Sequence, residues 1–254
     1  TTTLRTDGVY LDNRRPESVE WNLSLNEDLK RRDFTINSMA IDVARRLYYD
    51  PNNGIKDIEN KIIRCVGNPE KRINEDALRI LRAYRFLGQI NTNNWKLEDS
   101  LAKVITNNSY LIDDLAKERI WQELIKILNS NKSQEITRIM IRDKILNVIF
   151  GWKYVETSKL LSALDDQQNL DYISLFVLVN YHLEDNSIVD LCKTLKLSKK
   201  DSKSIIFTSK MARLIPRNDL SYLRLYRHLI GTRWRQILSL SNIFDQHDMI
   251  DFHN

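Results

Sequence analysis

Residues 75–86 read Glu75-Asp76-Ala77-Leu78-Arg79-Ile80-Leu81-Arg82-Ala83-Tyr84-Arg85-Phe86, and this stretch opens the helical part of the chain. Its apolar residues recur at three- and four-residue spacing, which predicts a helix over about 69–91. Four charged residues are spaced three apart along it: Asp76, Arg79, Arg82 and Arg85. Adjacent members are neighbours on a helix surface. At about 100° per residue, each step of three turns back by roughly 60°, so the two ends of this spiralling row address different groups.

An Asp–Arg pair at 76 and 79 would place a hydrogen-bond acceptor beside a donor. Cytosine and adenine present an amino donor beside a ring-nitrogen acceptor, whereas guanine and uracil present the reverse order. One such pair could therefore accept C and A and reject G and U. The arginine forks of Arg82 and Arg85 suit phosphate oxygens. The alternative interpretation is an ordinary helix surface carrying Glu75–Arg79 and Asp76–Arg79 ion pairs.

Glycine and proline divide the 254-residue chain into a mixed, turn-rich first part and an almost wholly helical remainder. Short strands are expected at 8–11 and 19–21, a helix that begins at Ser24, a hairpin over 39–49, a short helix at 55–61 and a strand at 62–66. Helices are then expected over about 69–91, 96–107, 110–129, 132–144, 157–166, 170–183, 187–195, 199–214, 219–229 and 232–241.

A second distinctive block, Arg31-Arg32-Asp33-Phe34-Thr35-Ile36-Asn37-Ser38-Met39-Ala40, precedes the arginine row. Between the two blocks lie Asp50-Pro51 with Gly54, and the run 64–69. Before them come the run 2–8 and the polar loop with Asp12, Arg14, Arg15 and Pro16. A weaker block follows at 116–124.

This ordered set resembles the tRNA nucleotidyltransferase/poly(A) polymerase family, in the class shared by bacterial and eukaryotic CCA-adding enzymes. The resemblance implies a mostly helical protein: the remnant of a small α/β nucleotidyltransferase head, then a helical neck, body and tail. The expected divisions are 1–66, 67–129, 130–190 and 191–254. The implied function is addition of C, C and A to tRNA from CTP and ATP. The alternatives are a bacterial poly(A) polymerase, an enzyme that adds only part of CCA, and a non-catalytic tRNA- or nucleotide-binding remnant.

The resemblance also assigns roles to residues. Those implied to bind the incoming nucleotide are Arg32, Asp33, Asn37, Asp76, Arg79, Arg82 and Arg85. Asp33 could instead cap a helix and Asn37 could hold a turn. The loop with Asp12, Arg14 and Arg15 resembles the flexible loop of the family, with a solvated hairpin tip as the alternative.

The family holds two metal ions on an early DxD motif behind a Gly-Gly turn, and neither pattern occurs before Arg31. No residue is therefore assigned as a catalytic or metal-binding carboxylate, and Mg²⁺ is expected only in the complete enzyme. We expect this chain alone to bind ATP or CTP weakly and to add no nucleotide. A separate N-terminal fragment is a possible partner.

Charge is unevenly distributed along the chain, whose net charge is +5. Residues 190–235 hold twelve Lys and Arg against three acids, which fits contact with a polyanion; a solvated helical face is the alternative. The expected tRNA contacts are Lys193, Lys196, Lys199, Lys200 and Lys203. The first residues predict no signal peptide, and the given sequence contains no apolar run of about 20 residues. Cys65 and Cys192 have no metal-site spacing, and a cytoplasmic location without a membrane partner is expected.

Overall fold

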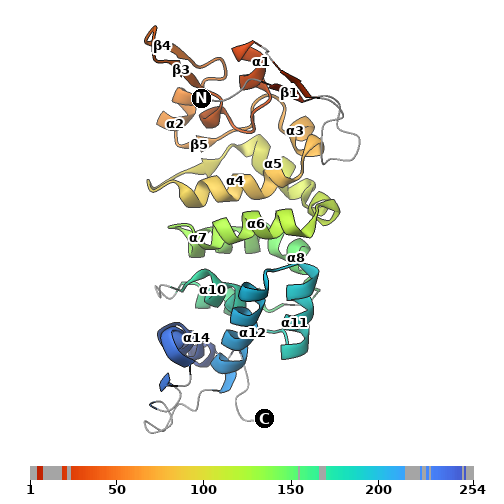
Figure 1. The fold of residues 1–254 in the computed structure, drawn as a ribbon, viewed down its shortest axis with the longest axis vertical. Helices are drawn as coiled ribbons and strands as arrows, with labels where there is room; N and C mark the ends of the chain where they lie inside the picture. Colours follow the sequence, from red (N-terminus) through yellow and green to blue (C-terminus); the bar gives the residue numbers. More distant parts are fainter. Residues whose placement is uncertain are drawn as a thin grey trace.

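The computed structural model describes residues 5–7, 19–21, 24–153, 155–165, 170–214, 224, 227–228, 230–247 and 249. Helices dominate, and they stack in successive layers along the long axis of the molecule (Figure 1). The few short strands gather at the N-terminal end. This arrangement confirms the expected fold of a small mixed head followed by a helical remainder. No helix of the part described is long and apolar enough to cross a membrane.

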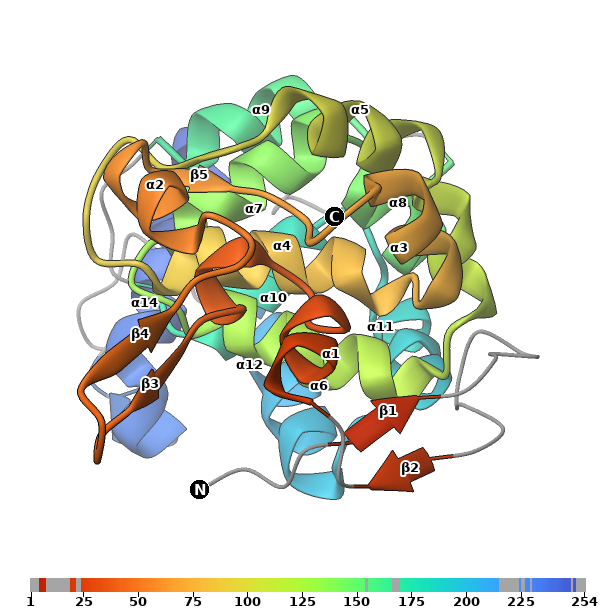
Figure 2. The same cartoon turned by 90° about the horizontal axis from the view of Figure 1, so that it is seen from above.

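Among the described residues, the head contains two two-stranded sheets, one strand of a third sheet, and short helices. Its elements are β1 (Arg5–Asp7), β2 (Val19–Trp21), α1 (Leu25–Lys30), η1 (Thr35–Asn37), β3 (Ala40–Asp42), β4 (Leu47–Tyr49), α2 (Gly54–Glu59) and β5 (Ile62–Ile63). β1 pairs antiparallel with β2, and β3 pairs antiparallel with β4 as the expected hairpin. Figure 2 looks down on this end and shows these two pairs on opposite sides of α1. The expected strand at 8–11 lies outside the described residues.

The helix expected from Ser24 begins there, because the Ser24 hydroxyl and the Glu27 carboxylate form a capping box. It ends at Lys30, before the Arg31–Ala40 block. Phe34 forms an isolated bridge with Cys65, and the Thr35 N–H donates to the Arg64 carbonyl at 3.0 Å. These contacts place the block against the segment that follows β5. Cys65 and Cys192 are both buried free thiols.

The remaining elements form the helical stack. They are α3 (Pro69–Glu75), α4 (Leu78–Gln89), β6 (Lys96–Leu97), α5 (Asp99–Asn107), η2 (Ser109–Asp114), α6 (Lys117–Leu128), α7 (Ser133–Arg142), α8 (Ile145–Phe150), α9 (Thr157–Ala163), α10 (Tyr172–Val179), α11 (Asp185–Thr194), α12 (Lys199–Leu214), η3 (Gly231–Arg233) and α14 (Trp234–Gln246). β6 pairs in parallel with β5 and so joins the stack to the head.

Three of the expected helices differ in the structure. The helix expected at 69–91 is divided into α3 and α4, and the one expected at 110–129 is divided into η2 and α6. The first residues of the helix expected at 96–107 form β6. Most of the helix expected at 219–229 lies outside the described residues.

One apolar core runs through the stack from Phe34 to Met249. At its head end the Phe34 ring meets Phe86 of α4 edge to face at 5.4 Å. In the middle, every residue from Ile173 to Val179 of α10 is buried, so that helix is enclosed on all sides. Between these points Trp121 of α6 contacts Phe176 edge to face at 5.6 Å. The continuous core holds α4 in a fixed position under the head.

Candidate nucleotide-binding site

The buried carboxylate of Asp28 anchors the start of the Arg31–Ala40 block. It accepts hydrogen bonds from Arg31 and from Nε and Nη2 of Arg32, the latter two at 3.2 and 2.9 Å. Burial by itself would raise the pKa of Asp28, but the hydrogen bonds from Arg32 and Arg31 outweigh it and lower the pKa. Arg32 also donates to the main-chain carbonyl of Asn37 at 3.2 Å. The guanidinium of Arg32 is therefore held in place while about a third of its side chain stays exposed.

Arg72 of α3 fastens the same block from the other side. Its guanidinium donates to the main-chain carbonyls of Arg31 and Arg32, the second at 2.8 Å, and also pairs with Glu75. Burial, followed by the neighbouring charge of Arg79, lowers the pKa of Arg72. A single side chain thus joins the head block to the helix that precedes the arginine row.

Asp33 connects the head directly to α4. One carboxylate oxygen accepts from the Phe34 N–H at 2.9 Å, and the other accepts from Nε of Arg82 at 2.8 Å. The alternative that Asp33 caps a helix is wrong, because η1 has Phe34 at its N-cap and no side-chain cap. The Asp33 side chain is nearly buried, whereas 36% of the Arg82 side chain is exposed. The free part of Arg82 is available to a ligand.

The Asp76–Arg79 pair expected on one helix is not formed. α3 ends at Glu75, and Asp76 has an extended backbone with φ −153° and ψ 100°. Its carboxylate accepts from the Leu78 N–H at 3.1 Å, a local bond that competes with helix continuation. The second oxygen accepts from Arg119 of α6 at 2.9 Å. The expected row therefore begins only at Arg79, and Asp76 lies just before α4.

Arg79 and Arg85 are largely enclosed. Arg79 is 8% exposed and donates to Glu75 at 3.2 Å and to the main-chain carbonyl of Arg72. The Glu75–Arg79 pair of the alternative interpretation is therefore present. Arg85 pairs with Glu123 of α6 at 3.1 Å, and its guanidinium lies 4.7 Å from the centre of the Phe86 ring. Burial lowers the pKa of Arg85, although the charge of Glu123 opposes this shift.

Two of these contacts involve partners that sequence reasoning missed, Asp28 and Arg72, and two involve Arg119 and Glu123 of the weaker block at 116–124, to which it assigned no role. Asp28 stands three and four residues before Arg31 and Arg32, a spacing that could have indicated the pairs on a helix. Arg72 contacts the main-chain carbonyls of Arg31 and Arg32, which lie 41 and 40 positions earlier in the sequence. No local sequence pattern predicts a contact over that distance. The Asn37 side chain is half-buried beside this cluster. Asp12, Arg14 and Arg15 lie outside the described residues.

Known families match both the head and the stack. The family described as "Poly A polymerase head domain" matches residues 1–64. The family described as "Probable RNA and SrmB- binding site of polymerase A" matches residues 94–161. The CCA-adding enzyme of Ligilactobacillus salivarius is 37% identical over 211 residues, which are 82% of this chain and 51% of that enzyme. The chain belongs to the tRNA nucleotidyltransferase/poly(A) polymerase family.

Other members of the tRNA nucleotidyltransferase/poly(A) polymerase family are also similar. The CCA-adding enzyme of Streptococcus gordonii is 47% identical over 127 residues, which are 50% of this chain and 31% of that enzyme. The crystal structure of the Bacillus stearothermophilus CCA-adding enzyme in complex with CTP matches with a TM-score of 0.77 and 25% identity, covering 96% of this chain and 59% of that one. A tRNA nucleotidyltransferase complexed with a primer tRNA and an incoming ATP analog matches with a TM-score of 0.67 and 25% identity, covering 89% and 72%. The chain spans about half the length of the first curated relative, 51%.

The acidic side chains at this family site do not fit Mg²⁺. Asp33 and Asp76 are each engaged by one arginine, and Asp28 and Glu75 are each engaged by two. Among the described residues no three His, Cys, Asp or Glu side chains converge in a way that could hold a metal ion. What these residues offer is a set of fixed arginines for an anionic ligand.

The tail lysines fall into two groups. Lys193 pairs with Asp190 at 3.0 Å and Lys196 pairs with Glu118 at 2.7 Å. Lys199, Lys200 and Lys203 are exposed at the start of α12, and none has an acidic partner in the part of the chain described. The second group therefore presents the freer positive charge.

Proposed function

We propose that the complete protein is a CCA-adding tRNA nucleotidyltransferase that uses CTP and ATP. The observation that carries this is the Asp33–Arg82 contact, which fixes the head block against the arginine row of α4. Family membership and relatives named as CCA-adding enzymes support the same activity. So does the similarity to a relative bound to CTP and to another bound to a primer tRNA and an ATP analog.

In this proposal Arg32 and Arg82 face the triphosphate, because each keeps about a third of its side chain exposed while its position is fixed. Asp33 and Asn37 lie beside them and serve the ribose. Arg85 is paired inside the neck, so its contribution to phosphate binding is a longer-range positive charge. Fixed guanidinium groups lose little freedom when the ligand arrives.

Asp76 and Arg79 read the base in this proposal, each with hydrogen-bonding capacity left over. A carboxylate has about four acceptor positions, and Asp76 uses two of them for Leu78 and Arg119. Arg79 has five N–H donors, of which those on Nη1 contact Glu75 and the Arg72 carbonyl. An acceptor and a donor therefore remain for a base, and Arg119 and Glu75 hold the two groups in place.

Mg²⁺ would be bound in the complete enzyme by residues other than those described. Exposed cations of the tail would contact tRNA, and the protein would act in the cytoplasm. These expectations rest on the resemblance and on the charge of residues 190–235.

The test is nucleotide incorporation into a tRNA transcript that lacks CCA. We would join this chain to the N-terminal portion of the Ligilactobacillus salivarius enzyme that precedes the matched region, and use the unjoined chain as the baseline. The joined protein should add two C and one A and then stop. A long run of A would identify a poly(A) polymerase. No incorporation, in a joined protein that folds, would support a binding remnant and contradict the proposal.

A further inference from the structure

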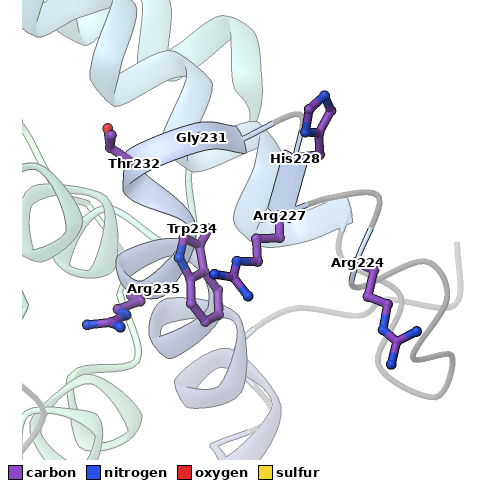
Figure 3. Close-up of a pocket in the computed structure, with 7 residues that line it drawn as sticks. All are labelled: Arg224, Arg227, His228, Gly231, Thr232, Trp234 and Arg235. Atoms are coloured by element: carbon purple, nitrogen blue, oxygen red, sulfur yellow. The ribbon is translucent and has the colours of Figure 1, made fainter.

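A second cluster of cations lies far from the neck, where η3 meets α14. A cavity of about 880 Å³ opens there (Figure 3). Its lining residues are Arg224, Arg227, His228, Gly231, Thr232, Trp234 and Arg235. The proposed reactions at the head and neck leave this cavity without a role.

The three arginines of the cavity carry positive charge that no acidic side chain among the described residues neutralises. Arg224, Arg227 and Arg235 are exposed, and no acidic side chain in the described part of the tail pairs with any of them. Arg233, which lies between Arg227 and Arg235 in the sequence, is different. It forms a bidentate ion pair with Asp171, in which Nη1 donates to Oδ2 at 2.7 Å and Nη2 donates to Oδ1 at 3.0 Å. Arg233, the last residue of η3, is therefore bound to the N-cap residue of α10, and the other three have no acidic partner among the described residues and can meet an anion.

Trp234 places an aromatic ring in the lining of the cavity. The Arg227 guanidinium lies 4.8 Å from the centre of the indole ring, and the Arg235 guanidinium lies 5.7 Å from it. Figure 3 shows Arg227 beside the ring, with Arg224 and Arg235 to either side of Trp234. Indole and guanidinium planes are the groups on which unstacked bases lie in single-stranded nucleic-acid sites. Arginines around the ring add phosphate contacts at the same place.

We propose that this cavity binds one unstacked nucleotide of an RNA, with the base on Trp234 and the flanking phosphates on Arg227, Arg235 and Arg224. The proposal rests on the proposed function, in which the substrate is tRNA. A free nucleotide has the same chemistry, but arginines on both sides of the ring suit a strand that continues past the base in both directions. The surplus of positive charge in residues 190–235 also favours a polyanion.

The first test compares Trp234→Leu with Trp234→Phe by RNA binding to this chain. Trp234 is half-buried and packs on the core, so both variants keep apolar bulk while only phenylalanine keeps an aromatic face. Trp234→Leu should weaken binding of a tRNA transcript on the order of tenfold and leave the salt dependence unchanged. Trp234→Phe should stay within about threefold of wild type. Blunt duplex RNA, which has no unstacked base, should bind all three proteins alike.

The second test asks whether base and phosphate contacts belong to one nucleotide. Arg227→Gln should cost little more once Trp234→Leu is present, because both contacts serve the same ligand. The matched control is the double variant Lys199→Gln with Lys200→Gln on α12. Its fold-loss of RNA affinity should be the same in wild type and in Trp234→Leu, so that the two losses multiply. If Arg227→Gln causes the same fold-loss of RNA affinity with and without Trp234→Leu, the proposal is overturned.

The remaining outcomes separate the ligand sources and the two proposals. If ATP or CMP binds at Trp234 at millimolar concentration while Trp234→Leu leaves the affinity for tRNA unchanged, the ligand is a free nucleotide and the RNA assignment is wrong. If tRNA binds and no cavity variant affects it, this inference fails and the proposed function stands. If Trp234→Leu weakens tRNA binding but the joined protein adds no nucleotide, the proposed function fails and the cavity assignment stands.

Discussion

Asp76 and Arg82 lie close in sequence, yet changing them should have different consequences for substrate choice. Asp76→Ala removes an acceptor for the amino group of C or A, and also removes the repulsion against a carbonyl. In the joined protein, discrimination against UTP should fall by about 1–3 kcal/mol. Arg82→Ala should lower the incorporation of CTP, ATP and UTP by a similar factor, because all three nucleotides carry the same phosphates and Arg82 would not contact the base. Incorporation kinetics with each triphosphate measure both effects.

Arg119→Ala is the control for Asp76. It keeps the carboxylate but removes the partner at 2.9 Å that holds it, so part of the discrimination should be lost. Adding Asp76→Ala to that variant should then cost less than in the wild type. If Asp76→Ala lowers the incorporation of CTP, ATP and UTP by one common factor, Asp76 has a structural role and the base-reading role is wrong.

Asp28 should make stability depend on acid pH. Its pKa is lowered in the folded state, so its stabilising effect is complete above the ordinary value of 3.8 and is lost as pH falls through the lower, folded-state pKa. Denaturant unfolding should show Asp28→Asn less stable than wild type at pH 6, with the gap closing below about pH 4. The control is Asp190→Asn, which removes an exposed pair with Lys193 and should change stability little at either pH. A gap that does not vary with pH would contradict this role.

Single residues also show where sequence reasoning stops. The arginines at 32, 79, 82 and 85 could be selected by type and spacing, and so could the local pair of Arg79 with Glu75, but partners far away in the sequence could not. Arg72 is the clearest case. Its carbonyl contacts are with a segment 40 positions away, and only the folded chain brings that segment within 2.8 Å. Composition and periodicity carry no information about such a contact.

At the scale of elements, the close approach of α4 to the loop after α6 depends on Gly88. A Cβ at Gly88 would overlap the Ser130 hydroxyl and lie 3.3 Å from Ile136 of α7. Gly88→Ala should therefore lower the free energy of unfolding by about 1–3 kcal/mol, measured by denaturant titration. Ser130→Gly in the same protein should recover part of the loss by making room. If the double variant is no more stable than Gly88→Ala alone, the overlap with Ser130 is not the cause.

Elements with strong local signals were predictable. α12 begins and ends where apolar periodicity placed it, α1 begins at the capping box of Ser24, and β3–β4 form the expected hairpin. The break at Asp76 was missed because periodicity continues across it. An Asp side chain that bonds the main chain two residues on ends one helix and starts another without changing the apolar pattern.

For the whole molecule, the prediction concerns charge. Reversing Lys199, Lys200 and Lys203 to Glu should flatten the salt dependence of tRNA binding, since each phosphate contact contributes about 0.7–0.9 log units per log unit of salt. The control reverses Lys193 and Lys196, which already face Asp190 and Glu118 and should change the slope less per residue. An unchanged slope in the triple variant would leave the start of α12 as solvated surface.

The layered order of the helices has a consequence for how the protein is made. Each layer packs mainly on elements close to it in sequence: α4 on α6 and α7, α7 on α8, α10 on α12, and α12 on α14 (Figure 1). Local pairing of this kind favours rapid folding. A ribosome releases only about 5–20 residues each second. The head and neck can therefore close while the tail is still being translated, and a chain interrupted after α8 would already hold the Asp33–Arg82 contact.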